Sequence, residues 1–422
     1  MKKRMLLGAL CAVALTSVAT ACGGGEKVYG DVSTEINIWA TAKEQPVIKA
    51  IVDEYNSKQK EETNKFKYKF TAVSEADAGT TLAKDPTIKD APALVLCADD
   101  HIYNLASKNI VSEVKGEFLT GIKENNTPVS ITGATYNNKV YGFPVTSDNG
   151  YFLWYNSAAL QGEQITSLEK LLEAAKAQKK TVGFAVNDGW YANSFLMSPQ
   201  ACGTKSLSWT AAADGKVSYQ TNWDNEVGVK VSTYIGSLLK PYYDSGTLLA
   251  ATNDVIEAGF KDGTMIAGIS GTWMEAPLKE ACSTIAATKL PEYHIDGIAY
   301  QMASFTGSKV YVLNKTRPVA EQKAAAALAE LLTNKNSQLV RFEQRSTIPS
   351  NKAALEDERY TKNVSISAKA LGMQNEFAAV QSQSAQDRYW DIGKAIGQAY
   401  LDGNEDWADF LKEQMDILRK AQ

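Results

Sequence analysis

Strand-like and helix-like patterns alternate along the first part of the chain. Residues 36–39 (Ile-Asn-Ile-Trp) form a short strand-like segment, and residues 66–70 alternate between apolar and polar positions with the period of two of a half-exposed strand. Between them, the apolar positions of residues 47–55 recur at helical spacing. Residues 93–96 are continuously apolar, which is typical of a strand covered on both faces. This alternation predicts an α/β architecture.

A polar segment lies between two strand-like segments in the middle of the chain. Residues 140–144 and 151–155 are strand-like, and the intervening residues 146–150 are polar and end in a glycine. Such a segment suits a chain that crosses from one lobe to another. Beyond it, we expect strands at residues 181–186, 265–269 and 310–313, and helices at residues 168–175, 319–332 and 407–418.

The N-terminus has the parts of an export signal. Three basic residues at positions 2–4 precede an apolar stretch over residues 6–18, which is too short to span a bilayer comfortably. Small residues follow up to Cys22. We therefore expect a signal peptide over residues 1–21. The junction resembles a bacterial lipobox, in which the cysteine becomes the lipid-bearing first residue, and simple secretion is the alternative.

Length, charge and cysteine content narrow the class of protein. A chain of 422 residues is too long for one typical core, which favours two lobes. The formal net charge of −4 becomes more negative when the basic signal is removed, and no basic cluster remains to bind nucleic acid. Beyond Cys22 only three cysteines follow, and this odd number argues against a disulfide framework. No later segment has the 18 uninterrupted apolar residues of a membrane span.

Several classes of chemistry find no support in the sequence. The two histidines, His101 and His294, have no second histidine or pair of thiols at metal-ligand spacing, so we expect no metal site. The chain has no phosphate-binding glycine loop and no G-x-S-x-G segment. We accordingly expect no cofactor, no nucleotide and no serine-hydrolase chemistry.

Tryptophans stand beside carboxylates and small residues at the ends of expected strands. Trp190 follows Asp188 and Gly189 after one strand, and Trp273 follows a second strand. Asp100 follows the strand at residues 93–96. Ligands of open α/β sheets bind at the carboxyl ends of strands, so these side chains can converge. An aromatic plane covers the C–H face of a pyranose, and a carboxylate accepts its hydroxyl hydrogen bonds, so the pattern favours a carbohydrate site.

The tryptophans also have a simpler interpretation. A single tryptophan in a protein of this size is more often part of the core than a platform for a ligand. Trp154 and Trp407 lie on patterned elements and are expected in the core. Trp209 and Trp223 lie in a polar stretch, where packing on a surface hairpin would account for them.

The acids have simpler interpretations too. An aspartate after a strand often caps a helix, and this would account for Asp100 or Asp188. Glu44 suits a solvated acid in a first helical turn, where the helix dipole favours it. Composition alone does not choose between these roles and ligand binding.

Five segments carry a more specific signal. They are Ile38-Trp39, residues 98–101 (Ala-Asp-Asp-His), residues 136–144 (Tyr-Asn-Asn-Lys-Val-Tyr-Gly-Phe-Pro), residues 260–273, and residues 348–351 (Ile-Pro-Ser-Asn). Together they resemble segments of the bacterial extracellular solute-binding proteins that serve carbohydrate ABC importers. Maltodextrin-binding proteins are the most similar group, and the resemblance extends from about residue 36 to residue 418.

The resemblance implies a two-lobed periplasmic-binding-protein-like fold with hinge crossings between the lobes. The first lobe is expected to comprise residues 35–147 and 309–345, and the second residues 150–304 and 349–422. A lipidated flexible tether is expected over residues 22–34.

The resemblance also implies the ligand site. Acidic and polar residues match sugar contacts of the family, and tryptophans match its stacking aromatics: Lys43, Glu44, Asp100, Asp148, Asp188, Trp190, Trp273 and Trp390. Cys97 stands where a relative can carry a stacking tryptophan, so one aromatic subsite is expected to be missing.

The implied function is capture of a malto-oligosaccharide without reaction. The protein would act as a monomer, lipid-anchored on the extracellular face of the cell membrane, and would deliver the sugar to the membrane permease subunits of an ABC importer. A xylo- or manno-oligosaccharide is the nearest alternative ligand. A secreted glycoside hydrolase is the rival class, because such enzymes also pair two carboxylates with aromatics. A surface receptor or adhesin is a third possibility.

Overall fold

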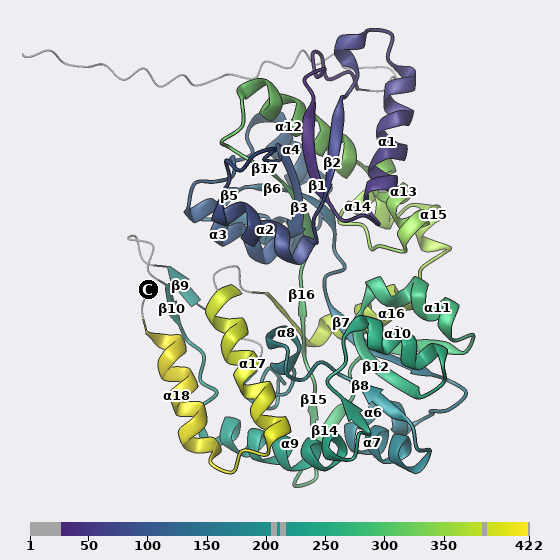
Figure 1. Ribbon diagram of the computed structural model, residues 1–422, viewed down its shortest axis with the longest axis vertical. Coiled ribbons are helices and arrows are strands. Elements are labelled where there is room, and N and C mark those ends of the chain that lie inside the picture. Colours follow the sequence, from purple (N-terminus) through teal and green to yellow (C-terminus); the bar gives the residue numbers. More distant parts are fainter. Residues whose placement is uncertain (1–26, 204–208, 212–216, 382–385, 421–422) are drawn as a thin grey trace, which may run out of the picture.

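The computed structural model describes residues 27–203, 209–211, 217–381 and 386–420. The expected signal peptide and Cys22 lie outside these residues. The described chain forms two lobes, each built on a five-stranded sheet with packed helices (Figure 1). The α/β architecture expected from the alternating pattern is confirmed.

The first lobe contains a sheet of strand order β2-β1-β3-β17-β6. β1 pairs parallel with β2 and β3, whereas β17 is antiparallel to β3 and β6. The elements of this lobe are β1 Ile36–Ala40, α1 Gln45–Lys58, β2 Tyr68–Ala72, α2 Glu75–Lys84, β3 Leu94–Ala98, α3 Ile102–Ser107, α4 Gly116–Asn125, α5 Pro128–Gly133, β4 Thr135–Tyr136, β5 Lys139–Val140, β6 Gly142–Thr146, β17 Lys309–Leu313, α12 Val319–Thr333 and α13 Lys335–Arg345. The strands and helices expected here are therefore present, with ends shifted by at most three residues.

The second lobe contains a sheet of strand order β11-β8-β12-β7-β13. Its elements are β7 Tyr151–Asn156, α6 Glu163–Thr166, α7 Leu168–Ala177, β8 Thr181–Gly183, α8 Gly189–Ala192, β9 Trp209–Ala211, β10 Val217–Tyr219, α9 Glu226–Asp244, β11 Leu248–Leu249, α10 Asn253–Lys261, β12 Met265–Gly271, α11 Glu275–Ala281, β13 Ile285–Thr288, β14 Glu292–Ile295, β15 Ile298–Gln301, β16 Ser304–Thr306, α16 Ile366–Gln374, β18 Ala378–Val380, α17 Gln386–Asp402 and α18 Trp407–Arg419. Two small helices, α14 Lys352–Leu355 and α15 Glu358–Thr361, lie between α13 and α16 in the chain.

The packing around strand β7 explains why its sequence is continuously apolar. Successive side chains of a strand point to opposite faces of the sheet. Tyr151 and Leu153 belong to one buried cluster, whereas Phe152 and Trp154 belong to another. Helices α7, α9 and α17 contribute to the first cluster, and α10, α11 and α16 to the second. The strand is therefore covered on both faces.

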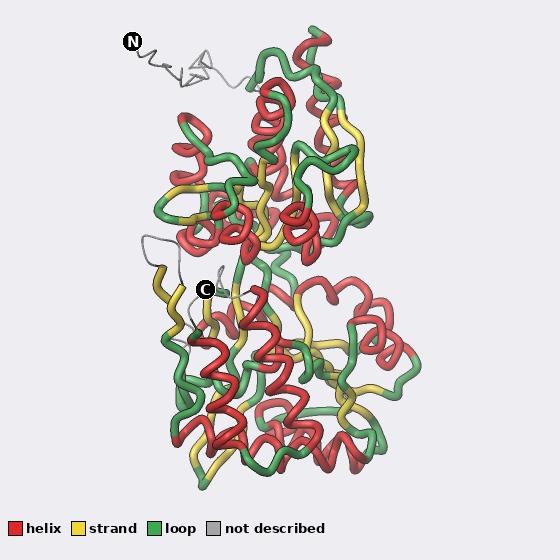
Figure 2. Tube along the Cα trace, turned by 60° about the vertical axis from the view of Figure 1, so that its left-hand side comes forward, coloured by secondary structure: helices red, strands yellow, loops and turns green. Residues whose placement is uncertain are grey.

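Hydrogen bonds join three segments of chain where the two lobes meet. The Ser147 amide donates to the Ile348 carbonyl at 2.9 Å, and the Asn149 amide donates to the Gly307 carbonyl at 3.2 Å. The Ile348 amide donates to Asp148 Oδ2 at 3.3 Å. Figure 2 shows the narrow connection between the two lobes.

Two segments pack on a different part of the protein from the one expected for them. Residues from Lys27 onward, expected in the tether, pack on the first lobe: Val32 is buried, and its amide donates to the Thr63 carbonyl at 2.8 Å. Residues 352–361, expected in the second lobe, pack on α13, because Phe342 and Tyr360 share a buried cluster. Figure 1 shows α14 and α15 beside α13.

Candidate ligand-binding site

In each sheet, the strand ends that precede the candidate site residues face the other lobe. Strands β1, β3 and β6 end at the edge of the first sheet where β17 begins, because Lys309 is paired with both Ala98 and Thr146. In the second sheet, Gly271 at the end of β12 is paired with Tyr151 at the start of β7. Only residues 147–150 separate β6 from β7, so the residues that follow these strand ends lie near the junction of the lobes (Figure 1).

A row of aromatic rings lies at the edge of the second sheet. The rings of Trp190 and Trp273 have centroids 5.9 Å apart, and Trp190 lies stacked with Phe305 at 6.5 Å and 12°. Phe305 meets Trp390 edge-on at 5.0 Å. All three indoles are partly exposed. The structure thus brings together the three tryptophans named from the sequence, and it adds Phe305, which had no distinguishing pattern around it.

Local backbone geometry fixes two of these indoles. Asp188 Oδ1 accepts a hydrogen bond from the Trp190 amide at 2.8 Å and so caps the short helix α8. A Cβ at Gly189 would overlap the carbonyl oxygen of Trp390, so only glycine allows α8 to approach α17 this closely. The capping role weighed for Asp188 is therefore present, and it places Trp190 next to the helix that carries Trp390.

Trp273 is held over a glycine. Its ring occupies the space that a side chain at Gly271 would need. Its indole nitrogen is buried and has no hydrogen-bond partner among the described residues. An N–H group buried in this way costs free energy until an acceptor reaches it.

The edge of the first sheet gathers acceptor atoms that also lack partners. Three carboxylate oxygens are buried without a hydrogen-bond partner in the described part of the chain: Asp100 Oδ1, Asp148 Oδ1 and Glu75 Oε1. The hydroxyls of Thr146 and Ser308 share this condition. The sequence indicated Asp100 and Asp148, whereas Glu75 was missed because it lies in an ordinary helical first turn.

Lys309 is the cation among these acids. Its ammonium lies 3.9 Å from Glu75 Oε2, and its side chain is 12% exposed. Burial alone would lower the pKa of Lys309, but the carboxylates of Glu75 and Asp148 outweigh burial and raise it. The ammonium therefore stays charged and partly offsets the acidic edge. No sequence motif distinguishes this lysine, since it is simply the first residue of β17.

The remaining predicted site residues lie in the turn before α1. Lys43 is exposed. Glu44 is only 2% exposed, and its two oxygens accept from Arg341 and Arg345 of α13. Burial alone would raise the pKa of Glu44, but the two guanidinium groups hold it below its usual value. The expectation of a solvated acid is wrong, and both carboxylate oxygens are already engaged within the protein.

Three further tryptophans lie in the protein interior. Trp154 and Trp407 are buried, as expected. Trp223 is fully buried against Tyr389, with ring centroids 5.4 Å apart, so its expected place on a surface hairpin is wrong. The sequence around Trp223 is polar, and its partner Tyr389 lies far away in the chain. The local pattern therefore did not indicate that Trp223 is buried.

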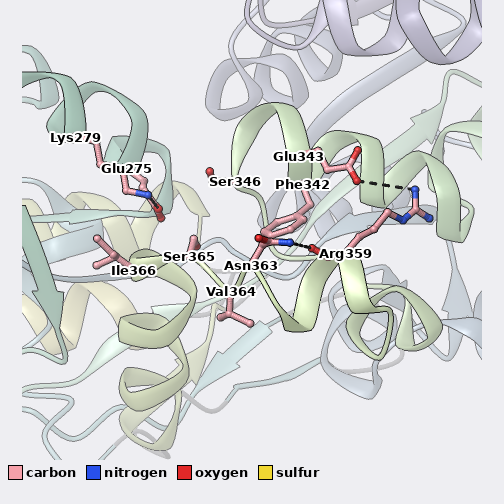
Figure 3. Close-up of a pocket in the computed structure, with 10 residues that line it drawn as sticks. All are labelled: Glu275, Lys279, Phe342, Glu343, Ser346, Arg359, Asn363, Val364, Ser365 and Ile366. Carbon is pink, nitrogen blue, oxygen red and sulfur yellow. Dashed lines mark hydrogen bonds and ion pairs between the residues drawn. The ribbon is translucent and has the colours of Figure 1, made fainter.

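A cavity of about 450 Å³ lies beside the junction of the lobes. Figure 3 shows its lining, which comes from α11, from α13 and the residue after it, and from the stretch that runs from α15 to the first residue of α16: Glu275, Lys279, Phe342, Glu343, Ser346, Arg359, Asn363, Val364, Ser365 and Ile366. Its charged groups are paired, since Glu275 accepts from Lys279 at 2.5 Å and Glu343 lies 4.0 Å from Arg359. None of the predicted site residues lines it.

Two classes of site are not found in the described residues. No group of three or more histidines, cysteines, aspartates or glutamates there is placed to hold a metal ion. In the same part of the chain, no helix combines the length and apolar character that a membrane span requires.

Comparisons with known proteins give one family model and one similar protein. The family model described as bacterial extracellular solute-binding protein matches residues 50–368. A galactooligosaccharide-binding protein of Bacillus subtilis (strain 168) is 24% identical over 386 residues, which cover 90% of this chain and 87% of that protein.

Solved structures share the fold. A maltodextrin-binding protein from L. casei BL23, determined without ligand, superposes with a TM-score of 0.73 at 19% identity, covering 92% of this chain and 99% of that one. A maltose/maltodextrin-binding domain from Bdellovibrio bacteriovorus, bound to maltotriose, gives a TM-score of 0.73 at 17% identity, with coverage of 92% and 99%. The two-lobed fold expected from the sequence is confirmed.

Proposed function

The chain belongs to the bacterial extracellular solute-binding proteins, and on this premise we propose that it captures a malto-oligosaccharide for an ABC-type importer. The observation that carries the proposal is the row of indoles formed by Trp273, Trp190 and Trp390 beside unpartnered carboxylate oxygens of Asp100 and Asp148.

The two halves of this site match the two kinds of surface of a pyranose. Its C–H faces gain dispersion contacts on aromatic planes. Its hydroxyl groups donate to carboxylate oxygens in charge-assisted bonds, and they also accept from donors such as the Trp273 indole. A sugar hydroxyl can both donate and accept a hydrogen bond. Hydroxyl groups can therefore pair with the unpartnered acceptors of the site and with its unpartnered donor.

The choice of sugar rests on the relatives. The structural neighbours include maltodextrin-binding proteins, one of them bound to maltotriose, which favours an α-glucan ligand. The galactooligosaccharide-binding relative makes a galacto-oligosaccharide the second candidate. Xylo- and manno-oligosaccharides remain further alternatives.

Capture would proceed by closure of the lobes. Residues 147–150, residues 305–308 and the segment that follows α13 would act as the hinge, because they are the places where the chain passes between the sheets. A ligand that contacts both lobes shifts the equilibrium toward the closed arrangement, which the permease subunits would recognise. A lipid on Cys22 would hold the monomer on the extracellular face of the membrane, at high effective concentration near its permease.

Calorimetry with a panel of oligosaccharides tests the proposal. Purified protein would be titrated with malto-, galacto-, xylo- and manno-oligosaccharides of equal length. We expect binding of the malto series, and chromatography of the same mixtures should show the sugar unhydrolysed. Binding of another series alone would replace the ligand, whereas release of shorter sugars would favour a glycoside hydrolase.

A further inference from the structure

Gln381 forms a hydrogen-bonded bridge from the first lobe to the aromatic row. Its Oε1 accepts from the indole nitrogen of Trp190 at 3.1 Å, and its Nε2 donates to Asp99 Oδ1. The second oxygen of Asp99 accepts from the Ser308 amide at 2.9 Å. Asp99 directly follows β3 in the first lobe, whereas Trp190 belongs to α8 in the second. The bridge therefore joins residues on both sides of the junction.

The bridge is buried and closely packed. Asp99 is 1% exposed and Gln381 is 3% exposed. A Cβ at Gly307 would come within 2.7 Å of Gln381 Nε2 and within 2.8 Å of Asp99 Oδ1. The Gln381 backbone amide also donates to the Thr306 carbonyl at 3.1 Å, which anchors the backbone beside the side-chain amide. The side chain of Gln381 thus has little freedom to adopt another arrangement.

The order of donors and acceptors in the bridge is fixed by chemistry. An indole nitrogen only donates, so the oxygen of the Gln381 side-chain amide must face Trp190. The NH₂ group of the same amide must then face Asp99, which is required to accept. An ionised carboxylate meets this requirement best, because both of its oxygens accept in charge-assisted bonds.

We propose that Gln381 is a positioning residue, which holds the indole of Trp190 in its stacking orientation through the bridge to ionised Asp99. The inference rests on the proposed function, in which Trp190 stacks on the sugar. Gln381 itself would not touch the ligand. Its role would be to preset the ring, so that the bound orientation is already populated before the ligand arrives.

The surroundings of Asp99 make the bridge sensitive to pH. Burial, reinforced by the charge of Asp100, raises the pKa of Asp99 from 3.8 to about 7. The other charged or titratable groups near this end of β3 are Cys97, Asp100, His101, Glu75 and Lys309. Because the folded-state pKa is raised, Asp99 is ionised above about pH 7 and neutral below it. The charge-assisted bond to Gln381 is therefore lost as the pH falls.

The first experiment compares sugar affinity between pH 8 and pH 6. We expect the wild-type protein to bind malto-oligosaccharide about fivefold more weakly at pH 6, which is the ratio expected when a charge-assisted hydrogen bond becomes a neutral one. Gln381→Met should weaken binding about tenfold at pH 8, through loss of preorganisation, and should remove the pH step. Gln374→Met is the matched control, because Gln374 is a fully buried glutamine of the same lobe that bonds to backbone groups of Leu290 and Met302.

The Gln381→Glu variant should reverse the pH dependence of sugar affinity, which a purely structural role of Gln381 would not produce. In this variant, a protonated carboxyl group at position 381 can donate to Asp99 and still accept from Trp190, whereas two ionised carboxylates repel each other. This variant should bind more tightly at pH 6 than at pH 8. Wild-type affinity and an unchanged pH profile in both Gln381 variants would overturn the proposal.

Tryptophan fluorescence of the free protein separates this inference from the proposed function. We expect the wild-type emission to shift between pH 8 and pH 6 without any sugar, and the shift to be absent in Gln381→Met and retained in Gln374→Met. That result with no sugar binding would preserve the bridge and refute the proposed ligand. A shift that persists in a folded Gln381→Met protein would overturn the bridge, and if that variant fails to fold, the reversal in Gln381→Glu decides.

Discussion

Removing the side chain of Trp273 should weaken sugar binding far more than it weakens the fold. The ring is partly exposed beside Trp190, and its N–H group has no partner in the described structure. Stacking on an aromatic side chain is worth about 1–3 kcal/mol by analogy with nucleic-acid bases, and a hydrogen bond to the indole about 1 kcal/mol. Trp273→Ala should therefore lose about 2–4 kcal/mol of binding free energy, or about 30-fold to 700-fold in affinity.

A conservative substitution divides this loss into its two parts. Trp273→Phe keeps an aromatic plane but removes the N–H donor, so it should cost only about 1 kcal/mol, or about fivefold in affinity. Isothermal titration calorimetry with maltotriose, after the ligand panel has established binding, measures both variants. A larger loss for phenylalanine than for alanine would contradict the division into stacking and hydrogen bonding.

Trp154 provides the control for stability. It is fully buried in strand β7, and its N–H group donates to the Gly271 carbonyl at 3.2 Å. Trp154→Ala should cost about 3–5 kcal/mol in the free energy of unfolding, whereas Trp273→Ala should cost less, because its ring is only partly buried. Urea denaturation measures both. Unchanged sugar affinity in a folded Trp273→Ala protein would refute the assignment of this ring to the site.

Three further predictions concern positions around the site and at the N-terminus. Glu44→Ala should lower stability at pH 7 by about 3–5 kcal/mol, because the Arg341 guanidinium is left buried without its partner. The pKa of Glu44 is lowered in the folded protein, so its contribution is complete above pH 4.5 and is lost as the pH falls through the folded value; urea denaturation at pH 7 and pH 3 should show the difference between wild type and variant shrinking. Gly189→Ala should cost about 1–3 kcal/mol and weaken sugar binding, since the new Cβ overlaps the Trp390 carbonyl; Gly372→Ala, where nothing lies within 4 Å, should leave sugar binding close to wild type and should not lower stability, since alanine is the better helix former within α16. Cys22→Ser should move the protein from the membrane fraction to the soluble fraction of cells, and retention on the membrane would refute the lipid anchor.

Local patterns were sufficient to predict most elements of the fold. The strand β3 follows from a continuous apolar run and the helix α1 from apolar positions at helical spacing, and neither requires knowledge of distant residues. The end of β8 was less predictable: a strand was expected over residues 181–186, but pairing stops at Gly183. Beyond that point the chain must turn to form α8, and tertiary packing on α17 decides where the turn begins.

The site was predictable only where strand ends carry unusual residues. Trp190 and Trp273 lie in the segments that follow strands β8 and β12, so their convergence follows from sheet topology. Lys309, Phe305 and Gln381 gave no such signal, because their roles depend on partners far away in sequence. The Gln381 side chain bonds to Asp99 across 282 positions, and Arg341 reaches Glu44 across 297. The buried partner of Glu44 explains why its interpretation as a solvated acid was wrong.

The division of the site between the lobes determines what each half contributes to closure. A ligand that stacks only on the indoles of the second lobe gains the same free energy in the open and closed arrangements, so it shifts no equilibrium. Hydrogen bonds from the same ligand to the first-lobe carboxylates of Asp100 and Glu75 would form only when the first lobe approaches, and two such bonds would be worth about 3–6 kcal/mol. This range reaches the roughly 5.5 kcal/mol that moves a two-state equilibrium from 1:99 to 99:1. In the proposed mechanism, the aromatic row would select a ligand with flat apolar faces, whereas the acidic edge would convert its capture into closure.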